Sequence, residues 1–125
     1  MGTRDLSAFL AVPDAIQFQA QHHWDDIRSQ AHRYARECLE FITALTGIEP
    51  LYPADSGWYA QMVTIPLPMD IEPLVFKERL YNKFKVEAPM IVWEGLKMIR
   101  LSFPAYNRPN DVETVVLAIR SLISK

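Results

Sequence analysis

The chain has 125 residues, of which 50% are apolar, and its 13 basic and 15 acidic side chains give a formal net charge of -2. This length is typical of one domain, so we expect residues 1–125 to fold as a single unit. The slightly acidic balance argues against a nucleic-acid-binding protein, because such a protein needs a basic face. No apolar run approaches the roughly 20 residues that cross a bilayer, and the N-terminus lacks a signal-peptide pattern, so we expect a cytoplasmic protein without a membrane span.

The first half of the chain is predicted to be helical. Apolar residues from 6 to 21 suit a helical segment that is bent or restarted at Pro13, and two short helices fit this pattern better than one. A regular apolar period over residues 25–46 predicts the longest helix, which Gly47 ends. Residues 48–58 are rich in proline and predict a loop.

Strands alternate with helices in the second half. We expect strands at residues 59–66, 86–93 and 97–103, and the last two form a hairpin around Glu94-Gly95. Pro89 indicates that the middle strand lies at a sheet edge, because proline has no N–H to donate. The intervening helix begins at Pro73 and runs to about residue 84, and residues 111–124 form a closing amphipathic helix.

The last predicted strand, residues 97–103, has two different faces. Ile99, Leu101 and Phe103 alternate with Met98, Arg100 and Ser102, so Arg100 points away from the aliphatic face. Pro104 ends the strand, and Asn110 or Asp111 can cap the helix that follows. The whole order of elements predicts an α+β fold, in which a small, mainly antiparallel sheet is covered by helices on one face.

The side chains that commonly bind metals do not predict a metal site. The single cysteine, Cys38, excludes an internal disulfide and a cysteine-rich metal site, and its place on the apolar face of a helix predicts a buried thiol. His22 and His23 are adjacent and diverge, while His32 is nearly three turns further along without a carboxylate at ligand spacing. We therefore expect no bound metal.

The stretch that begins at Arg100 resembles the C-terminal signature of the class V aminotransferase family, whose members are pyridoxal-phosphate enzymes. Its parts are Arg-Leu-Ser, then Tyr-Asn, then an acidic residue that opens a terminal amphipathic helix. The isopenicillin N epimerase-like branch is the most similar, and the resemblance covers essentially the whole chain but only the last third of such an enzyme. Three further segments carry this resemblance: Gly2-Thr3-Arg4-Asp5, Glu49-Pro50-Leu51-Tyr52-Pro53 and Arg79-Leu80-Tyr81.

The resemblance implies a fold like the C-terminal small domain of fold-type I pyridoxal-phosphate enzymes, and roles for two residues. Arg100 would bind the substrate α-carboxylate, a task that suits a planar fork of donors. Thr3 would reach across a dimer and contact the cofactor phosphate held by the other subunit. Without the resemblance, Arg100 would be interpreted as a solvated strand arginine and Thr3 as part of a frayed terminus.

The resemblance also implies which parts of the enzyme are missing. The Schiff-base lysine and the aspartate partner of the cofactor ring belong to the family's large domain, which would sit on the uncovered sheet face. None of the chain's lysines has a matching context, so we expect a catalytically incomplete chain that holds no cofactor by itself.

The expected partners of the chain are an amino-acid substrate and either a large pyridoxal-phosphate-binding domain or further copies of itself. The alternatives are a cysteine desulfurase or selenocysteine lyase-type domain, and a non-catalytic, self-associating binding module. The lysines are Lys77, Lys83, Lys85, Lys97 and Lys125.

Overall fold

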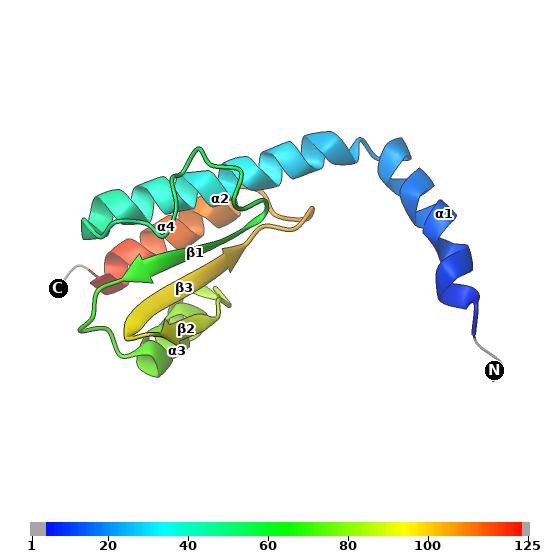
Figure 1. Cartoon of the computed structure of the whole chain (residues 1–125). Coiled ribbons are helices and arrows are strands. Elements are labelled where there is room, and N and C mark those ends of the chain that lie inside the picture. Colours follow the sequence, from blue (N-terminus) through cyan, green and yellow to red (C-terminus); the bar gives the residue numbers. More distant parts are fainter. Residues whose placement is uncertain (1–4, 124–125) are drawn as a thin grey trace.

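A computed structural model describes residues 5–123 and shows a three-stranded sheet backed by helices (Figure 1). The strands are antiparallel in the order β1-β3-β2, and α2, α4 and α3 cover one face, which confirms the α+β fold predicted from the sequence. Along the chain the elements are α1 (Ser7–Gln21), α2 (Trp24–Thr46), β1 (Met62–Leu67), α3 (Pro73–Phe84), β2 (Met90–Trp93), β3 (Leu96–Ser102) and α4 (Pro109–Ile123).

The core lies between the sheet and the helices α2, α3 and α4. α2 packs over β1 and against α4, and α4 packs against α3. Burying each large aliphatic side chain of this core contributes roughly 1.5–3 kcal/mol to the free energy of unfolding. The largest fully buried aliphatic side chains are Leu39, Ile42, Ile65, Leu80, Ile99 and Ile119.

Both outer strands are shorter than the sequence predicts. β1 begins at Met62 rather than residue 59, because Tyr59 turns into the preceding loop, where its ring stacks on Tyr52 and its hydroxyl donates to the Ala54 carbonyl. β2 begins at Met90 rather than residue 86. The Val86 N–H donates to the Leu80 carbonyl at the C-terminal end of α3, so it is not available to a strand. The predicted edge position of β2 is confirmed.

The other sheet edge is covered by a tyrosine. The Thr64 N–H of β1 donates to the Tyr52 hydroxyl oxygen at 3.0 Å, and that hydroxyl donates to the Thr64 carbonyl at 3.5 Å. These contacts satisfy the outward-facing backbone groups at the middle of β1. The edge is therefore blocked against pairing with another strand at this point.

The prediction that residues 6–21 form two helices is wrong, because α1 is one helix that contains Pro13. Ala11 and Ala15, two residues to either side of the proline, favour helix, and the helix continues through Pro13 despite the lost donor. The break comes instead at His23, whose φ of 50° is in the left-handed region and turns the chain between α1 and α2. The predicted end of α2 at Gly47 is confirmed.

α4 begins at Pro109, two residues before the predicted start. Asp111 acts from the first turn of this helix, where its carboxylate accepts from the Arg108 N–H at 2.9 Å and from the Asn107 side-chain amide at 3.0 Å. This contact to the residue before the helix is half of a capping box. Over the described residues, 5–123, none of the helices combines the length and hydropathy that crossing a bilayer requires.

Candidate functional site

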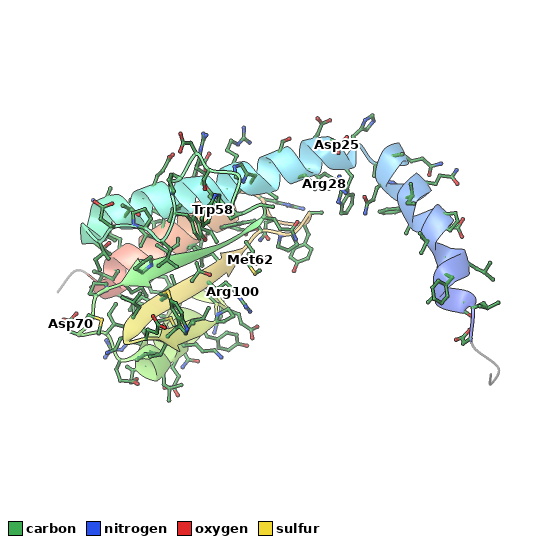
Figure 2. The ribbon with its side chains drawn as sticks, in the orientation of Figure 1. Asp25, Arg28, Trp58, Met62, Asp70 and Arg100 are labelled. Atoms are coloured by element: carbon green, nitrogen blue, oxygen red, sulfur yellow. The ribbon has the colours of Figure 1, made fainter. Side chains whose placement is uncertain are left out.

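Arg100 lies near the middle of the sheet, on the side that no helix covers. It belongs to β3, pairs with Thr64 on β1, and its N–H donates to the Pro89 carbonyl at 3.0 Å just before β2. Neighbouring Ile99 and Leu101 are buried against the helices, whereas the Arg100 side chain is exposed (Figure 2). The alternation predicted from the sequence is confirmed.

We call the helix-free side of the sheet the open face. Directly paired residues share a face, so the register assigns each strand residue to one side. Arg100 is the only charged residue among the strand residues of this face. The open face consists of Met62, Thr64 and Pro66 from β1, Ile91 and Trp93 from β2, and Leu96, Met98, Arg100 and Ser102 from β3.

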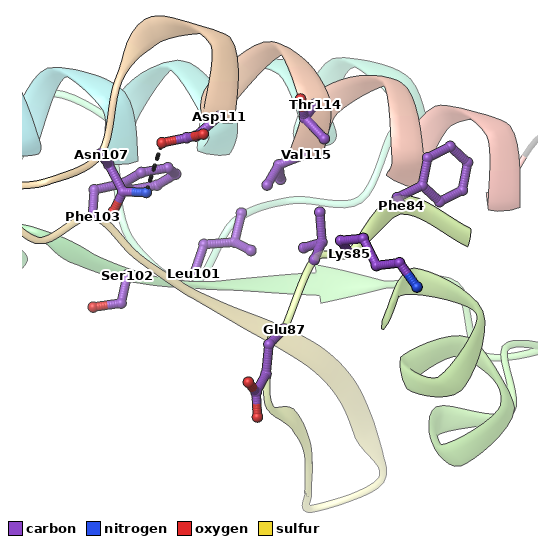
Figure 3. A pocket seen from close by; sticks show the side chains of 11 residues that line it. Phe84, Lys85, Glu87, Leu101, Ser102, Phe103, Asn107, Asp111, Thr114 and Val115 are labelled. Atoms are coloured by element: carbon purple, nitrogen blue, oxygen red, sulfur yellow. Dashed lines mark hydrogen bonds between the residues drawn. The ribbon is translucent and has the colours of Figure 1, made fainter. Parts of the chain in front are cut away.

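The Arg100 guanidinium has no protein partner within residues 5–123, since no carboxylate lies at ion-pair distance and no hydrogen bond to its side chain forms. Glu87, which lies shortly before β2, is not within ion-pair distance of Arg100. Figure 3 shows Glu87 and Ser102 projecting away from α4, whereas Leu101 points toward it. The arginine is therefore free to bind an anion that approaches from the open side.

An apolar strip lies beside Arg100 on the open face. Met98, two residues before the arginine on the same face, is only 3% exposed although no helix covers it. Its cross-strand partners, Pro66 and Ile91, flank it on both sides and exclude water. Sequence reasoning missed this strip, because it is created by the register between three strands. A less polar surface next to a guanidinium strengthens its attraction for a carboxylate.

The structure brings no lysine to Arg100. Lys97 belongs to the opposite face of β3, where its ammonium donates to the Met69 and Ile71 carbonyls at 2.6 and 2.7 Å. Lys77, Lys83 and Lys85 are exposed on α3 and at its end. Thr3 and Lys125 lie outside the described residues, so the predicted phosphate contact of Thr3 stays a prediction.

The thiol of Cys38 is confirmed as part of the core. It is fully buried in α2, and burial raises the pKa of the thiol to about 12, so the group is neutral at physiological pH. A neutral, inaccessible thiol is a poor nucleophile. Cys38 therefore does not supply a reactive sulfur.

Two of the three histidines, His22 and His32, form structural contacts with their side chains. The His32 Nδ1–H donates to the Ala60 carbonyl at 3.1 Å and its ring lies 4.8 Å from that of Tyr59, while His22 donates to Phe18 and stacks on its ring. In the part of the chain that the structure describes, no three histidine, cysteine or acidic side chains are grouped so that they could hold a metal ion.

A cavity of about 350 Å³ lies on the helix side of the sheet, between α4 and the segment that leads from α3 to β2 (Figure 3). Its polar lining consists of Lys85, Glu87, Ser102, Asn107, Asp111 and Thr114. The Asn107 amide donates to Asp111, so these two side chains are engaged in holding the start of α4. Ser102, at the end of β3, reaches this cavity from the edge of the open face, whereas Arg100 does not line it.

Comparison with known proteins shows similarity over nearly the whole chain. This chain is 31% identical over 121 residues to a protein named isopenicillin N epimerase from Amycolatopsis lactamdurans. The matched region covers 97% of this chain and 30% of that protein. The isopenicillin N epimerase of Streptomyces clavuligerus is 27% identical over 124 residues, with the same coverage. A protein named probable L-cysteine desulfhydrase, chloroplastic, from Arabidopsis thaliana is 28% identical over 137 residues, covering 98% of this chain and 29% of that protein.

These similarities confirm the resemblance inferred from the sequence. The chain spans about 30% of the length of these relatives. No protein-family model matches the chain.

Proposed function

We propose that this chain, which is related to the C-terminal part of class V aminotransferase-like proteins, supplies the substrate-binding arginine of an isopenicillin N epimerase-like enzyme. Arg100 would bind the α-carboxylate of an amino-acid substrate. The observation that carries this proposal is that Arg100 is the only charged strand residue of the open face and has no partner within residues 5–123. All its guanidinium donors therefore remain available to a ligand.

The chemistry of the open face suits a carboxylate. A guanidinium offers two parallel N–H donors to the two oxygens of a carboxylate, which fixes orientation as well as position. Thr64 opposite Arg100 is neutral, and Met98 beside it is apolar, so neither competes for the cation. In this role Arg100 would orient the substrate, and proton transfer would belong to other groups.

The described residues do not fit pyridoxal phosphate as a bound cofactor. The enzymes of this class hold it as an imine with a lysine, and it then serves as an electron sink for the substrate. No described lysine lies on the open face, and the Lys97 ammonium is held by two carbonyls on the other side. We therefore assign the cofactor to a larger partner domain that would sit on the open face, and we keep a Thr3 contact to its phosphate as a proposal.

A second candidate is a sulfur-releasing enzyme of the cysteine desulfurase or selenocysteine lyase type. One relative is named a probable L-cysteine desulfhydrase, which favours this candidate. A desulfurase also needs an accessible cysteine that accepts the sulfur, and Cys38 is fully buried with a raised pKa. We therefore favour the epimerase-like function and place the sulfur chemistry second.

The proposal is tested by Arg100→Lys in a complete enzyme, made by supplying this chain with the remaining part of an isopenicillin N epimerase. Lysine keeps the charge and loses the fork, so KM for the amino acid should rise and kcat should fall. Arg120→Lys, at an exposed position on α4, is the matched control and should leave both constants unchanged. Unchanged kinetics for Arg100→Lys, or unfolding of the chain, would show that Arg100 is structural.

A further inference from the structure

Tyr52 lies at the outer edge of β1, beside the strand residue that faces Arg100. Its hydroxyl accepts a hydrogen bond from the Thr64 N–H at 3.0 Å and donates one to the Thr64 carbonyl at 3.5 Å. These are the two backbone groups that a further strand would bind, since β1 is the last strand on this side of the sheet. One side chain therefore takes the place of a neighbouring strand at Thr64.

Aromatic contacts fix where the Tyr52 hydroxyl lies. The Tyr52 ring stacks on that of Tyr59, with centroids 5.2 Å apart and an angle of 28° between the two planes. Tyr59 is only 8% exposed, its hydroxyl donates to the Ala54 carbonyl, and its ring lies 4.8 Å from that of His32 on α2. The loop that carries Tyr52 is therefore joined to α2, and the hydroxyl is presented to β1 from a packed ring.

Thr64 connects this contact to the candidate site. Thr64 and Arg100 are directly paired, but their backbone groups face opposite ways: those of Thr64 face Tyr52, and the Arg100 N–H donates to the Pro89 carbonyl on the β2 side at 3.0 Å. In such a non-hydrogen-bonded pair the side chains lie closer together than in a hydrogen-bonded pair. The place of the threonine beside the arginine is therefore set by the neighbouring pairs of the ladder and by Tyr52.

We propose that Tyr52 is a positioning residue for the Arg100 site, an inference that rests on the proposed function. By holding Thr64, its hydroxyl keeps the space beside the guanidinium constant, so that the arginine presents one orientation to the substrate carboxylate. Two parallel N–H donors are sensitive to a displacement of this kind, because both hydrogen bonds depend on the angle of the guanidinium plane. Tyr52 itself stays at the sheet edge and acts through Thr64 and Arg100.

Amide hydrogen exchange of the full chain, followed by NMR, tests whether Tyr52 holds β1. Tyr52→Phe keeps the stacked ring and removes only the hydroxyl, so the Thr64 amide should exchange at least about tenfold faster. The amide of Leu39, which is fully buried in α2, should keep its protection and so verify that the variant is folded. Tyr81→Phe, at a 54% exposed position on α3, is the matched control and should leave Thr64 exchange unchanged. An unchanged Thr64 amide in Tyr52→Phe would overturn the proposal.

Kinetics of the complete enzyme test whether Tyr52 acts through Arg100. Tyr52→Phe should raise KM for the amino acid roughly fivefold and leave kcat within about twofold, because it disturbs binding geometry and removes no reacting group. In an Arg100→Ala background the same change should have no further effect on kcat/KM, since the guanidinium that Tyr52 positions is gone. An equal loss in both backgrounds would indicate a general structural defect and would overturn the positioning role.

The positioning role and the proposed function give different results when they fail. If Arg100→Lys impairs the enzyme while Tyr52→Phe leaves KM unchanged, the positioning role alone is overturned. If Arg100→Lys leaves the kinetics unchanged, the proposed function is refuted, and the positioning role is refuted with it even when the Thr64 amide exchanges faster in Tyr52→Phe.

Discussion

Arg100 on β3 lies directly opposite Thr64 on β1, with both side chains on the open face. Directly opposite residues in an antiparallel pair have Cβ atoms about 4.5–5.5 Å apart. A carboxylate at position 64 would therefore reach the guanidinium. The neutral threonine leaves the arginine free for a ligand.

Thr64→Glu should convert Arg100 into half of a cross-strand ion pair. In a complete enzyme we expect KM for amino acids to rise, because the new carboxylate competes with that of the substrate. The free energy of unfolding of the chain should change little, since an exposed pair contributes about 0.2–1 kcal/mol. Thr64→Val, which fills the position without charge, should leave KM near its original value. An equal rise in KM for both variants would count against competition for Arg100.

Cys38 should resist alkylation in the folded chain. Its pKa is raised from 9.0 to about 12 by burial, so the reactive thiolate is scarce as well as inaccessible. Iodoacetamide should modify it only in denaturant, as measured by mass spectrometry. Fast modification of the native chain at neutral pH would contradict the buried, neutral thiol and would favour the sulfur-transfer alternative.

The same shift predicts a loss of stability at high pH. The pKa of the folded thiol is above that of the unfolded chain, so its contribution is fully present below about pH 9 and is lost as the pH rises toward 12. Cys38→Ala should remove this part of the pH dependence, while also costing some core packing. Urea unfolding of both chains over this range measures the difference.

Asp111 should stabilise the start of α4 more at neutral than at acid pH. Hydrogen bonds from the Arg108 N–H and the Asn107 side chain lower the pKa of its carboxyl below the ordinary 3.8. The stabilisation is therefore present above the ordinary pKa and lost as the pH falls through the lowered one. Asp111→Asn should cost about 1 kcal/mol at neutral pH in urea unfolding. Glu113→Gln, at an exposed position on the same helix, is the control, and an equal loss in it would argue against the specific contacts of Asp111.

Local patterns in the sequence predicted most helices and strands of this fold. They did not predict features that depend on contacts between segments, such as the register of the strands. The alternation around Arg100 and the stop at Gly47 are single-segment signals, and both are confirmed. The late start of β1 depends on where the Tyr59 ring packs, and the burial of Met98 depends on its partners across two strands. The continuity of α1 through Pro13 was missed because a proline weakens a helix without always ending it.

The candidate site was predicted only in part, because the sequence indicates which face a residue lies on but not which residues lie opposite it. The alternation placed Arg100 on the correct face, but the neutral Thr64 opposite it and the absence of an acidic partner within residues 5–123 follow from register. The cytoplasmic location and the role of Thr3 stay predictions.

The central claim, that Arg100 binds the substrate carboxylate, is tested most directly by a thermodynamic cycle in the complete enzyme. The value of kcat/KM would be measured for an amino acid and for its carboxamide, each with the original chain and with Arg100→Ala. If the guanidinium binds the carboxylate, the original enzyme should prefer the acid and Arg100→Ala should lose that preference, with a coupling energy of roughly 2–4 kcal/mol. A coupling energy near zero, with both substrates losing the same factor, would contradict the claim.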